Sequence, residues 1–298
     1  MFKILKYLIL IRFRKIFAKD DFFAMFLLLT VITVLCCFFQ INYSQKADYL
    51  LFFAFQIFGL HIDRKDLSFL KLNRNFRFIL FLEYLIFSLP ILILLLLNSK
   101  WVFIFAYLLS NYLITFINKK GSKALKYPFK MFDVFWTISF RKYKLFVLIP
   151  IFGFLIFMSQ KYQNLNLQYF VLLCLGIILC IPSSEREKIH FIKASAYIGK
   201  DYLLQQIKTI LYNSMFVLIP IAIVFAVLQE FDKLVFIPLL LVFPVVNLLF
   251  KYVFFDRIIV HNIFFVMFIG CLMYGFPLLF IPILFIKSIK NLKIIQNA

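Results

Sequence analysis

Residues 183–200, SSEREKIHFIKASAYIGK, decide the fold, because they place a charged segment between two long apolar stretches. Two serines followed by Glu185 are typical of a helix start, where a hydroxyl caps the first amides and an acid favours the first turn. Apolar residues then recur at helical spacing, at Ile189, Ile192, Ala196 and Tyr197. We therefore expect one amphipathic helix here, either at a membrane surface or in a socket of another protein.

A second copy of this pattern lies nearer the start of the chain. Residues 63–71, DRKDLSFLK, align without a gap on residues 185–193, EREKIHFIK. The shared order is an acid, an arginine, two charges, an aliphatic residue, any residue, phenylalanine, an aliphatic residue and lysine. Each copy precedes an apolar stretch that contains a proline, Pro90 or Pro220. An internal repeat is one explanation, and chance similarity in a chain rich in Phe, Ile and Lys is the other.

The composition predicts a polytopic membrane protein of the all-α class. The chain has 298 residues, of which 64% are hydrophobic, whereas soluble domains are nearer 45–50% apolar. Too little polar sequence is left for a soluble catalytic domain. The net charge of +20 lies in short loops between apolar spans. The excess of basic residues in cytoplasmic loops explains this charge better than binding to nucleic acid, so no nucleic-acid partner is expected.

About ten transmembrane helices are expected by the criterion of about 20 apolar residues per crossing. They fall at 22–41, 47–60, 78–98, 101–117, 145–159, 167–182, 203–228, 234–250, 258–273 and 275–288. The last two are also compatible with one kinked helix, because only Gly275 and its neighbours separate them. Before the first span, residues 3–19 combine basic and apolar residues, which favours an amphipathic helix in the cytoplasmic interface over a simple basic leader.

Loop charges predict that both ends of the chain lie in the cytoplasm. With ten spans, the outside loops hold about one basic residue each, namely Lys46, Lys100, Lys161 and Lys233. Both copies of the charged pattern then lie on the cytoplasmic side, so the repeats are parallel. The predicted halves are 1–124, an interfacial helix with four spans, and 125–298, an interfacial segment with six spans.

Motifs for chemistry are absent from the sequence. It contains no G-x-x-x-x-G-K-[ST], no H-E-x-x-H and no G-x-S-x-G. The five cysteines lie inside apolar spans without a C-x-x-C pair, so neither a disulfide nor a metal site is expected. The histidines, His61, His190 and His261, fall at cytoplasmic span ends and are expected at the membrane interface. We expect no catalytic residue, no metal and no bound cofactor, and hence no enzyme.

The few polar residues inside spans are candidates for a transport path. Glu83 is expected to pair with Arg64 or Arg77, either as an acid in the path or as a structural ion pair. Gln205, Thr209 and Asn213 are spaced i, i+4 and i+8 and share one helix face. They line a substrate path or serve as hydrogen-bond contacts between helices, the role also expected of Asn111 and Asn247.

In this layout the chain resembles an ABC-2 type transporter permease. The resemblance implies that residues 3–19 form the interfacial helix and that the two charged segments are coupling helices, which dock on a separate ATPase subunit that binds ATP. The residues implied in coupling are Asp63, Arg64, Asp66, Phe69, Lys71, Glu185, Arg186, Glu187, Phe191 and Lys193. A typical permease of this family has six spans and one such helix. This chain therefore supplies both halves of a transporter, or it pairs with a second copy of itself.

The expected function is thus the permease subunit of an ABC-type exporter in a bacterial-type inner membrane, with the lipid bilayer and an ATPase as partners. A ten-span secondary carrier of the drug/metabolite type is the alternative. It predicts inverted five-span repeats and glycine-rich helices, and the chain has only seven glycines. A third hypothesis, an integral-membrane enzyme that modifies lipids, predicts clustered acids or histidines at one membrane face.

Overall fold

The computed structural model describes residues 2–17, 21–43, 50, 54–62, 64, 66–117, 131–272 and 276–297. Within these ranges the chain is helical and contains no strand. It divides into two compact units, residues 1–122 and 123–298, here the N-terminal unit and the C-terminal unit. The all-α class is thereby confirmed, whereas the predicted division of the spans between two membrane halves stays a prediction.

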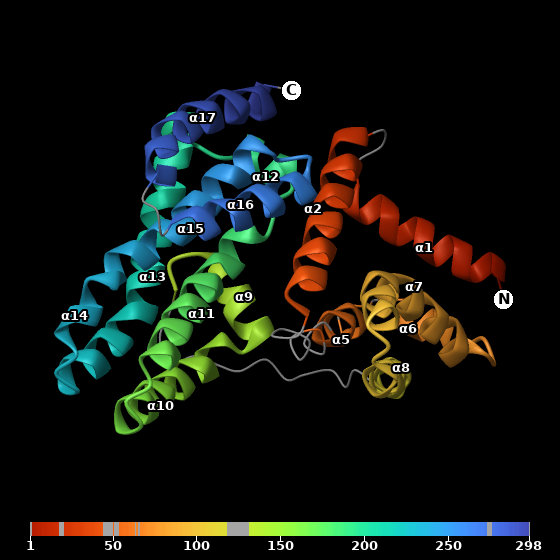
Figure 1. Cartoon of the computed structure of the whole chain (residues 1–298). Coiled ribbons are helices and arrows are strands. Elements are labelled where there is room, and N and C mark those ends of the chain that lie inside the picture. The colour runs from red at the N-terminus through yellow and green to blue at the C-terminus, as the bar shows by residue number, and fades with distance from the viewer. Residues whose placement is uncertain are drawn as a thin grey trace. The chain divides into compact units, whose positions relative to one another are not determined.

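The N-terminal unit is arranged around one long helix, α7. Its described helices are α1 (Phe2–Ile16), α2 (Phe22–Ile41), α5 (Ala54–Ile62), α6 (Leu67–Leu70), α7 (Phe76–Leu97) and α8 (Trp101–Ile114). Helices α1, α2, α5 and α8 all pack against α7 (Figure 1). Ile79, Leu80 and Tyr84 of α7 are almost fully buried in these contacts.

The C-terminal unit is arranged around α15 in the same way. Its described helices are α9 (Val134–Tyr143), η1 (Leu145–Val147), α10 (Leu148–Lys161), α11 (Leu165–Ser184), α12 (Ile189–Lys193), α13 (Lys200–Val227), α14 (Phe231–Leu234), α15 (Phe236–Val253), α16 (Ile258–Leu272), η2 (Phe276–Phe280) and α17 (Ile281–Asn297). Helices α11, α13, α16 and α17 pack on α15 (Figure 1). Gly176 allows the closest approach, because a Cβ atom there would lie 2.9 Å from the ring of Phe243.

Among the described residues, five helices are long and apolar enough to cross a membrane, so the chain is a multi-pass membrane protein. They are α2, α7, α11, α13 and the stretch Phe231–Val253, which joins α14 and α15. Helix α9 and the segment Leu145–Lys161 pass the same test together but are bent by 67°. Helices α8 and α16 are apolar but shorter. The 14 residues of α8 extend only about 21 Å, against a hydrocarbon core of about 30 Å.

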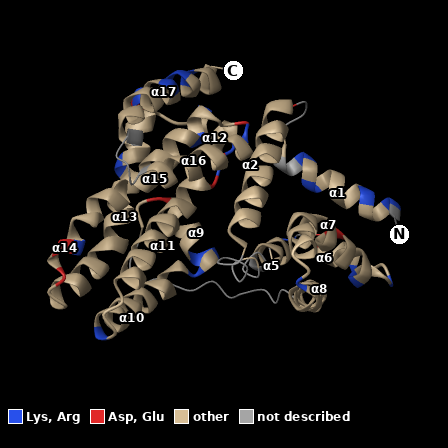
Figure 2. Cartoon of the chain, in the orientation of Figure 1, with Lys and Arg blue, Asp and Glu red and all other residues tan. Residues whose placement is uncertain are grey.

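Charged residues lie at or near the ends of the long apolar helices of the C-terminal unit (Figure 2). Helix α11 contains none, α10 carries only the terminal Lys161, and those of α13 lie in its first third. An uninterrupted apolar length with its backbone hydrogen bonds made internally is what a bilayer requires of a spanning helix.

The prediction of one helix over 183–200 is wrong. Helix α11 continues to Ser184, α12 occupies only Ile189–Lys193, and α13 begins at Lys200. The two serines end a helix instead of starting one, because the hydroxyls of Ser183 and Ser184 donate back to the carbonyl oxygen of Cys180. Such bonds to the preceding turn compete with capping of the next helix.

The two units repeat one order of helices. Among the described residues, a basic helix (α1 or α9), two apolar helices (α2 and α5, or α10 and α11), a short helix (α6 or α12), a long apolar helix (α7 or α13) and a further apolar helix (α8 or α15) occur in the same order, and the C-terminal unit inserts η1 and α14. Two of the equivalent pairs make matching contacts, since α2 contacts α7 as α10 contacts α13, and α5 contacts α8 as α11 contacts α15, but α1 packs on α7 whereas α9 packs on α11. The C-terminal unit adds α16 and α17.

Candidate functional site

Helix α6 presents one aromatic side chain to the surroundings and anchors itself with one aliphatic side chain. Phe69 is 76% exposed, whereas Leu70 is 8% exposed and packs with Ile79 and Leu80 of α7. Lys71, which follows, is exposed. A helix of four residues cannot be stable by itself. Its position is therefore set by the contacts behind it.

A buried ion pair lies directly behind α6. Arg64 Nη1 donates to Glu83 Oε2 of α7 at 2.6 Å, and the exposed fractions of the two side chains are 0% and 1%. The same guanidinium forms a two-pronged contact with Asp66, at 3.0 Å from Nε to Oδ1 and 2.8 Å from Nη2 to Oδ2. The expected pairing of Glu83 with Arg64 is confirmed. Arg64 is a buried anchor and is not part of the exposed surface of α6.

Helix α1 completes this cluster with Arg12, which donates to Glu83 Oε1 at 3.2 Å and lies 3.8 Å from Asp66 Oδ1. Two cations and two anions thus balance. Burial alone would lower the pKa of Arg64, but its bonds to Asp66 and the charge of Glu83 outweigh burial and raise it. Burial likewise opposes ionisation of Asp66, yet the hydrogen bonds from Arg64 hold its pKa below the ordinary value.

A chain of hydrogen bonds leads from this cluster to the end of α8. His61 Nε2 lies 2.8 Å from the carbonyl oxygen of Ile117, and His61 Nδ1 lies 2.6 Å from Tyr84 Oη. A carbonyl only accepts, so Nε2 carries the proton and Nδ1 of the neutral ring accepts from Tyr84. The Tyr84 oxygen in turn accepts from Arg64 at 3.4 Å. His61 and His261 are 1% and 2% exposed, so both are buried within their units, and their expected position at the membrane interface stays a prediction.

Helix α12 in the C-terminal unit repeats the surface of α6. Phe191, aligned with Phe69, is 57% exposed, and Ile192, aligned with Leu70, is fully buried. Lys193 is exposed, as Lys71 is. Helices α6 and α12 even begin at aligned residues, Leu67 and Ile189.

A second buried ion pair lies behind α12, with the charges reversed. Lys251 Nζ of α15 donates to Glu187 Oε1 at 2.7 Å, and the exposed fractions of the two side chains are 2% and 6%. In this unit the loop before the short helix supplies the acid and the long helix supplies the base. Lys251 escaped sequence reasoning because a single lysine at the end of an apolar span is what the positive-inside rule leads one to expect.

Two neighbours of Glu187 make weaker contacts. Arg186 donates to the carbonyl oxygen of Phe254 at 2.9 Å. Burial lowers the pKa of Arg186, although the charges of Asp256 and Glu187 act against that change. Glu185 lies 3.3 Å from Lys142, and both side chains are about a third to a half exposed, a setting in which ion pairs contribute little.

Asn247 joins three helices of the C-terminal unit. Its Nδ2 donates to the hydroxyls of Ser183 and Ser184 at 2.8 and 2.9 Å, and its Oδ1 lies 2.9 Å from His261 Nε2. Asn111 donates to Ser88 in a comparable contact between α8 and α7. The expected role of Asn111 and Asn247 as contacts between helices is confirmed.

The remaining predicted site residues are not brought together. Gln205 is exposed and Thr209 is half-buried, with its hydroxyl bonded to the Gln205 carbonyl at 3.0 Å. Asn213 is fully buried and accepts from the amide of Phe132 at 3.1 Å. Their role in a transport path, like that of Glu83, stays a prediction. Asp63 lies outside the described residues.

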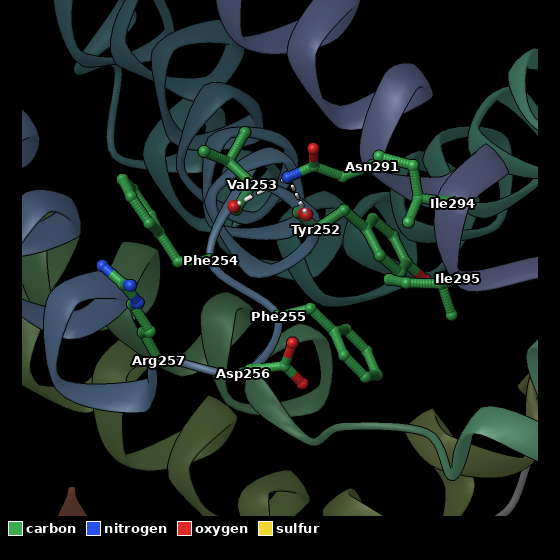
Figure 3. A pocket seen from close by; sticks show the side chains of 9 residues that line it. All are labelled: Tyr252, Val253, Phe254, Phe255, Asp256, Arg257, Asn291, Ile294 and Ile295. Atoms are coloured by element: carbon green, nitrogen blue, oxygen red, sulfur yellow. Dashed lines mark hydrogen bonds between the residues drawn. The ribbon is translucent and has the colours of Figure 1, made fainter. Parts of the chain in front are cut away.

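A half-open pocket of about 380 Å³ lies where α15 ends, beside α17 (Figure 3). The Asn291 side chain of α17 donates to the carbonyl oxygens of Tyr252 and Val253 at 3.2 and 2.9 Å, which satisfies two otherwise unpaired acceptors at the end of α15. Asp256 and Arg257 line its other side. None of the predicted site residues borders it, and within the described ranges no group of His, Cys, Asp or Glu is placed to hold a metal ion.

Comparison with protein-family models, with curated proteins and with solved structures finds no match for this chain.

Proposed function

We propose that the chain is the membrane-spanning subunit of an ABC-type exporter and that a separate ATPase subunit docks on α6 and α12. The observation that carries the proposal is the repeated surface, in which an exposed phenylalanine sits beside an exposed lysine on a very short helix in each unit. An aromatic side chain on a small protruding element is the kind of anchor that protein interfaces bury. The ATPase binds the ATP, and the chain contributes no catalytic residue.

The proposal includes ten spans with both ends in the cytoplasm of a bacterial-type inner membrane. Every expected span overlaps a described helix, although α5 covers only the second half of its span and α17 runs nine residues beyond the end of its span. With this topology α6 and α12 lie on the cytoplasmic side among most of the basic residues. The parallel orientation of the two units that the loop charges predict favours this function over a secondary carrier, which predicts inverted repeats.

In this mechanism the short helices are handles. Closure of the ATPase pushes on α6 and α12, and the buried residues Arg64 and Glu187 pass the displacement to the long helices behind them. The long apolar helices then change their packing and open the transport path to the other side.

The test is affinity purification of the full chain from its native membrane, with mass spectrometry of what binds. A P-loop ATPase should accompany the native chain and be lost from the variant that combines Phe69→Asp with Phe191→Asp. Charge reversal at Arg64 would be a poor probe, because it breaks a buried ion pair and changes the fold. Retention of the ATPase by the double variant would contradict docking at these helices.

Each unit offers a matched control residue at the end that lies away from its short helix. Trp101 at the start of α8 and Phe231 at the start of α14 are exposed aromatic residues, 67% and 61%. Each lies at the far end of a long helix from α6 or α12. Trp101→Asp and Phe231→Asp should leave binding of the ATPase unchanged. If the controls abolish binding as well, the loss reflects general damage and not a docking surface.

A further inference from the structure

Each buried ion pair lies at the same distance from a proline inside a long helix. In α7, Glu83 precedes Pro90 by seven residues, and in α15, Pro244 precedes Lys251 by seven residues. Seven residues are about two helical turns. In α7 the ion pair lies toward the end that follows α6. In α15 it lies at the C-terminal end, where Lys251 holds Glu187 of the segment before α12, while α12 itself packs on α17. In both helices the proline lies two turns further from the ion pair.

Proline marks the place where each long helix bends most easily. It has no N–H, so the carbonyl oxygens of Ile86 and Leu240 cannot accept the usual helical hydrogen bond from residues 90 and 244. In α7 the Ser88 hydroxyl also bonds to the Tyr84 carbonyl at 2.6 Å. Bonds of this kind favour bending of a helix.

The ion pairs fix the position of the segment before each short helix on its long helix more than they add to the free energy of unfolding. Compared with apolar replacements, a buried ion pair often contributes little to stability, but its geometry admits few alternatives. Arg64 holds Asp66, the residue before α6, and Glu83 of α7 at the same time. Glu187, two residues before α12, is held by Lys251 of α15.

We propose that each unit contains a lever, in which the short helix and the ion-paired end of a long helix move as one body and the bend occurs at the proline. The N-terminal lever comprises α6 and the part of α7 before Pro90. The C-terminal lever comprises α12 and the part of α15 after Pro244. The long helices involved are not equivalent in the repeat, since α13 occupies the place of α7. The two levers therefore have the same components, an ion pair and a proline seven residues from it, but these lie on helices that are not equivalent.

Electron paramagnetic resonance on the full chain in lipid nanodiscs tests the N-terminal lever. The native cysteines are replaced and spin labels are attached at positions 69 and 86, or at 69 and 97, where the native side chains are exposed. The first pair lies within the lever, so its distance distribution should be narrow. The second pair spans Pro90, so its distribution should be broad. A broad distribution within the lever, or a narrow one across the proline, overturns the proposal.

Two variants test the ion pair and the proline separately. Pro90→Ala restores the missing N–H, so the pair across residue 90 should lose its broad distribution while the chain stays folded. Glu83→Gln removes the ionic link, so the pair within the lever should lose its narrow distribution. If Glu83→Gln fails to fold, Pro90→Ala still decides the matter, because an unchanged distribution there rejects the pivot.

The C-terminal lever is tested with labels at positions 191 and 235 and the variant Pro244→Ala, which should narrow the distribution. Pro238→Ala is the matched control, because Pro238 lies in the first turn of α15, where no helical N–H is missed. The use of the levers in transport rests on the proposed function, but the motion of the levers does not depend on it. The distance measurements need no ATPase. If the distances between spin labels are distributed as expected but no ATPase accompanies the purified chain, only the proposed function is rejected.

Discussion

Glu83 is the residue on which the N-terminal unit depends most. It lies between Arg12 and Arg64, and its side chain is 1% exposed. Replacement by leucine removes one of the two acids that contact the buried Arg64 and leaves Asp66, which should lower the free energy of unfolding by up to about 3 kcal/mol. Thermal unfolding of the purified protein in detergent measures the loss.

A double variant checks this reason for the loss. If Glu83→Leu is combined with Arg64→Met, no charge of the pair remains buried, and most of the stability should return. Equal instability of the single and the double variant would show that the loss comes from poor packing and not from an unpaired charge.

Asp66 makes the stability of the same cluster depend on pH. Its pKa in the folded protein lies below the ordinary value of 3.8, because the bonds from Arg64 outweigh burial. Between these two values the unfolded chain binds more protons than the folded one, so stability is present above the ordinary pKa and falls as pH falls through the folded pKa. Melting temperatures between pH 7 and pH 3 should show this fall, and Asp66→Asn should flatten it. An identical slope in the variant would rule Asp66 out as its source.

At the scale of elements, the packing of α11 on α15 depends on a glycine. A Cβ atom at position 176 would lie 2.9 Å from Phe243 Cδ1 and 3.3 Å from Leu240 Cδ2. Gly176→Ala should therefore cost about 1–3 kcal/mol of unfolding free energy, as overpacked cores do. Gly270→Ala is the control, because no atom lies within 4 Å of the added methyl group and the higher helix propensity should stabilise α16 by about 0.5–1 kcal/mol. Destabilisation by both would show that the glycines matter for their backbone and not for packing.

The sequence predicted which segments are helical and apolar, because this information is local. Of the apolar face that it predicted, Ile189, Ile192, Ala196 and Tyr197, only Ile192 is buried, and the exposure of Phe69 and Phe191 was not predicted from the spacing. The sequence did not predict that α11 runs on through Ser184, since that depends on Asn247 of α15. The local pattern predicts that the Ser184 hydroxyl caps the following helix. In the structure it bonds to the Cys180 carbonyl of α11 and accepts from Asn247 of α15, so it lies at the end of α11.

At the scale of the whole molecule, most of the candidate site lay beyond the reach of the sequence. The Arg64–Glu83 pair joins residues 19 apart and was accessible to prediction, whereas Glu187 and Lys251 are 64 residues apart. Nothing local distinguishes Lys251 from the basic residues that flank any span. The burial of His61 likewise depends on a distant contact, with Ile117, 56 residues away, whereas His261 contacts Asn247, which is 14 residues away.

Membrane topology is the property on which the proposed function depends most, and it follows from the number of crossings. Single cysteines at positions 68 and 190, on α6 and α12, should react with a membrane-impermeant maleimide only from the cytoplasmic side. Cysteines at positions 99 and 229, in the turns after α7 and α13, should react only from the outside, because each is separated from α6 or α12 by one long apolar helix of 22 or 28 residues. All four are measured in intact cells and in inverted vesicles, on a chain whose native cysteines have been replaced. If positions 68 and 190 react from opposite sides, the units are not parallel, one ATPase surface cannot serve both short helices, and the proposed function fails.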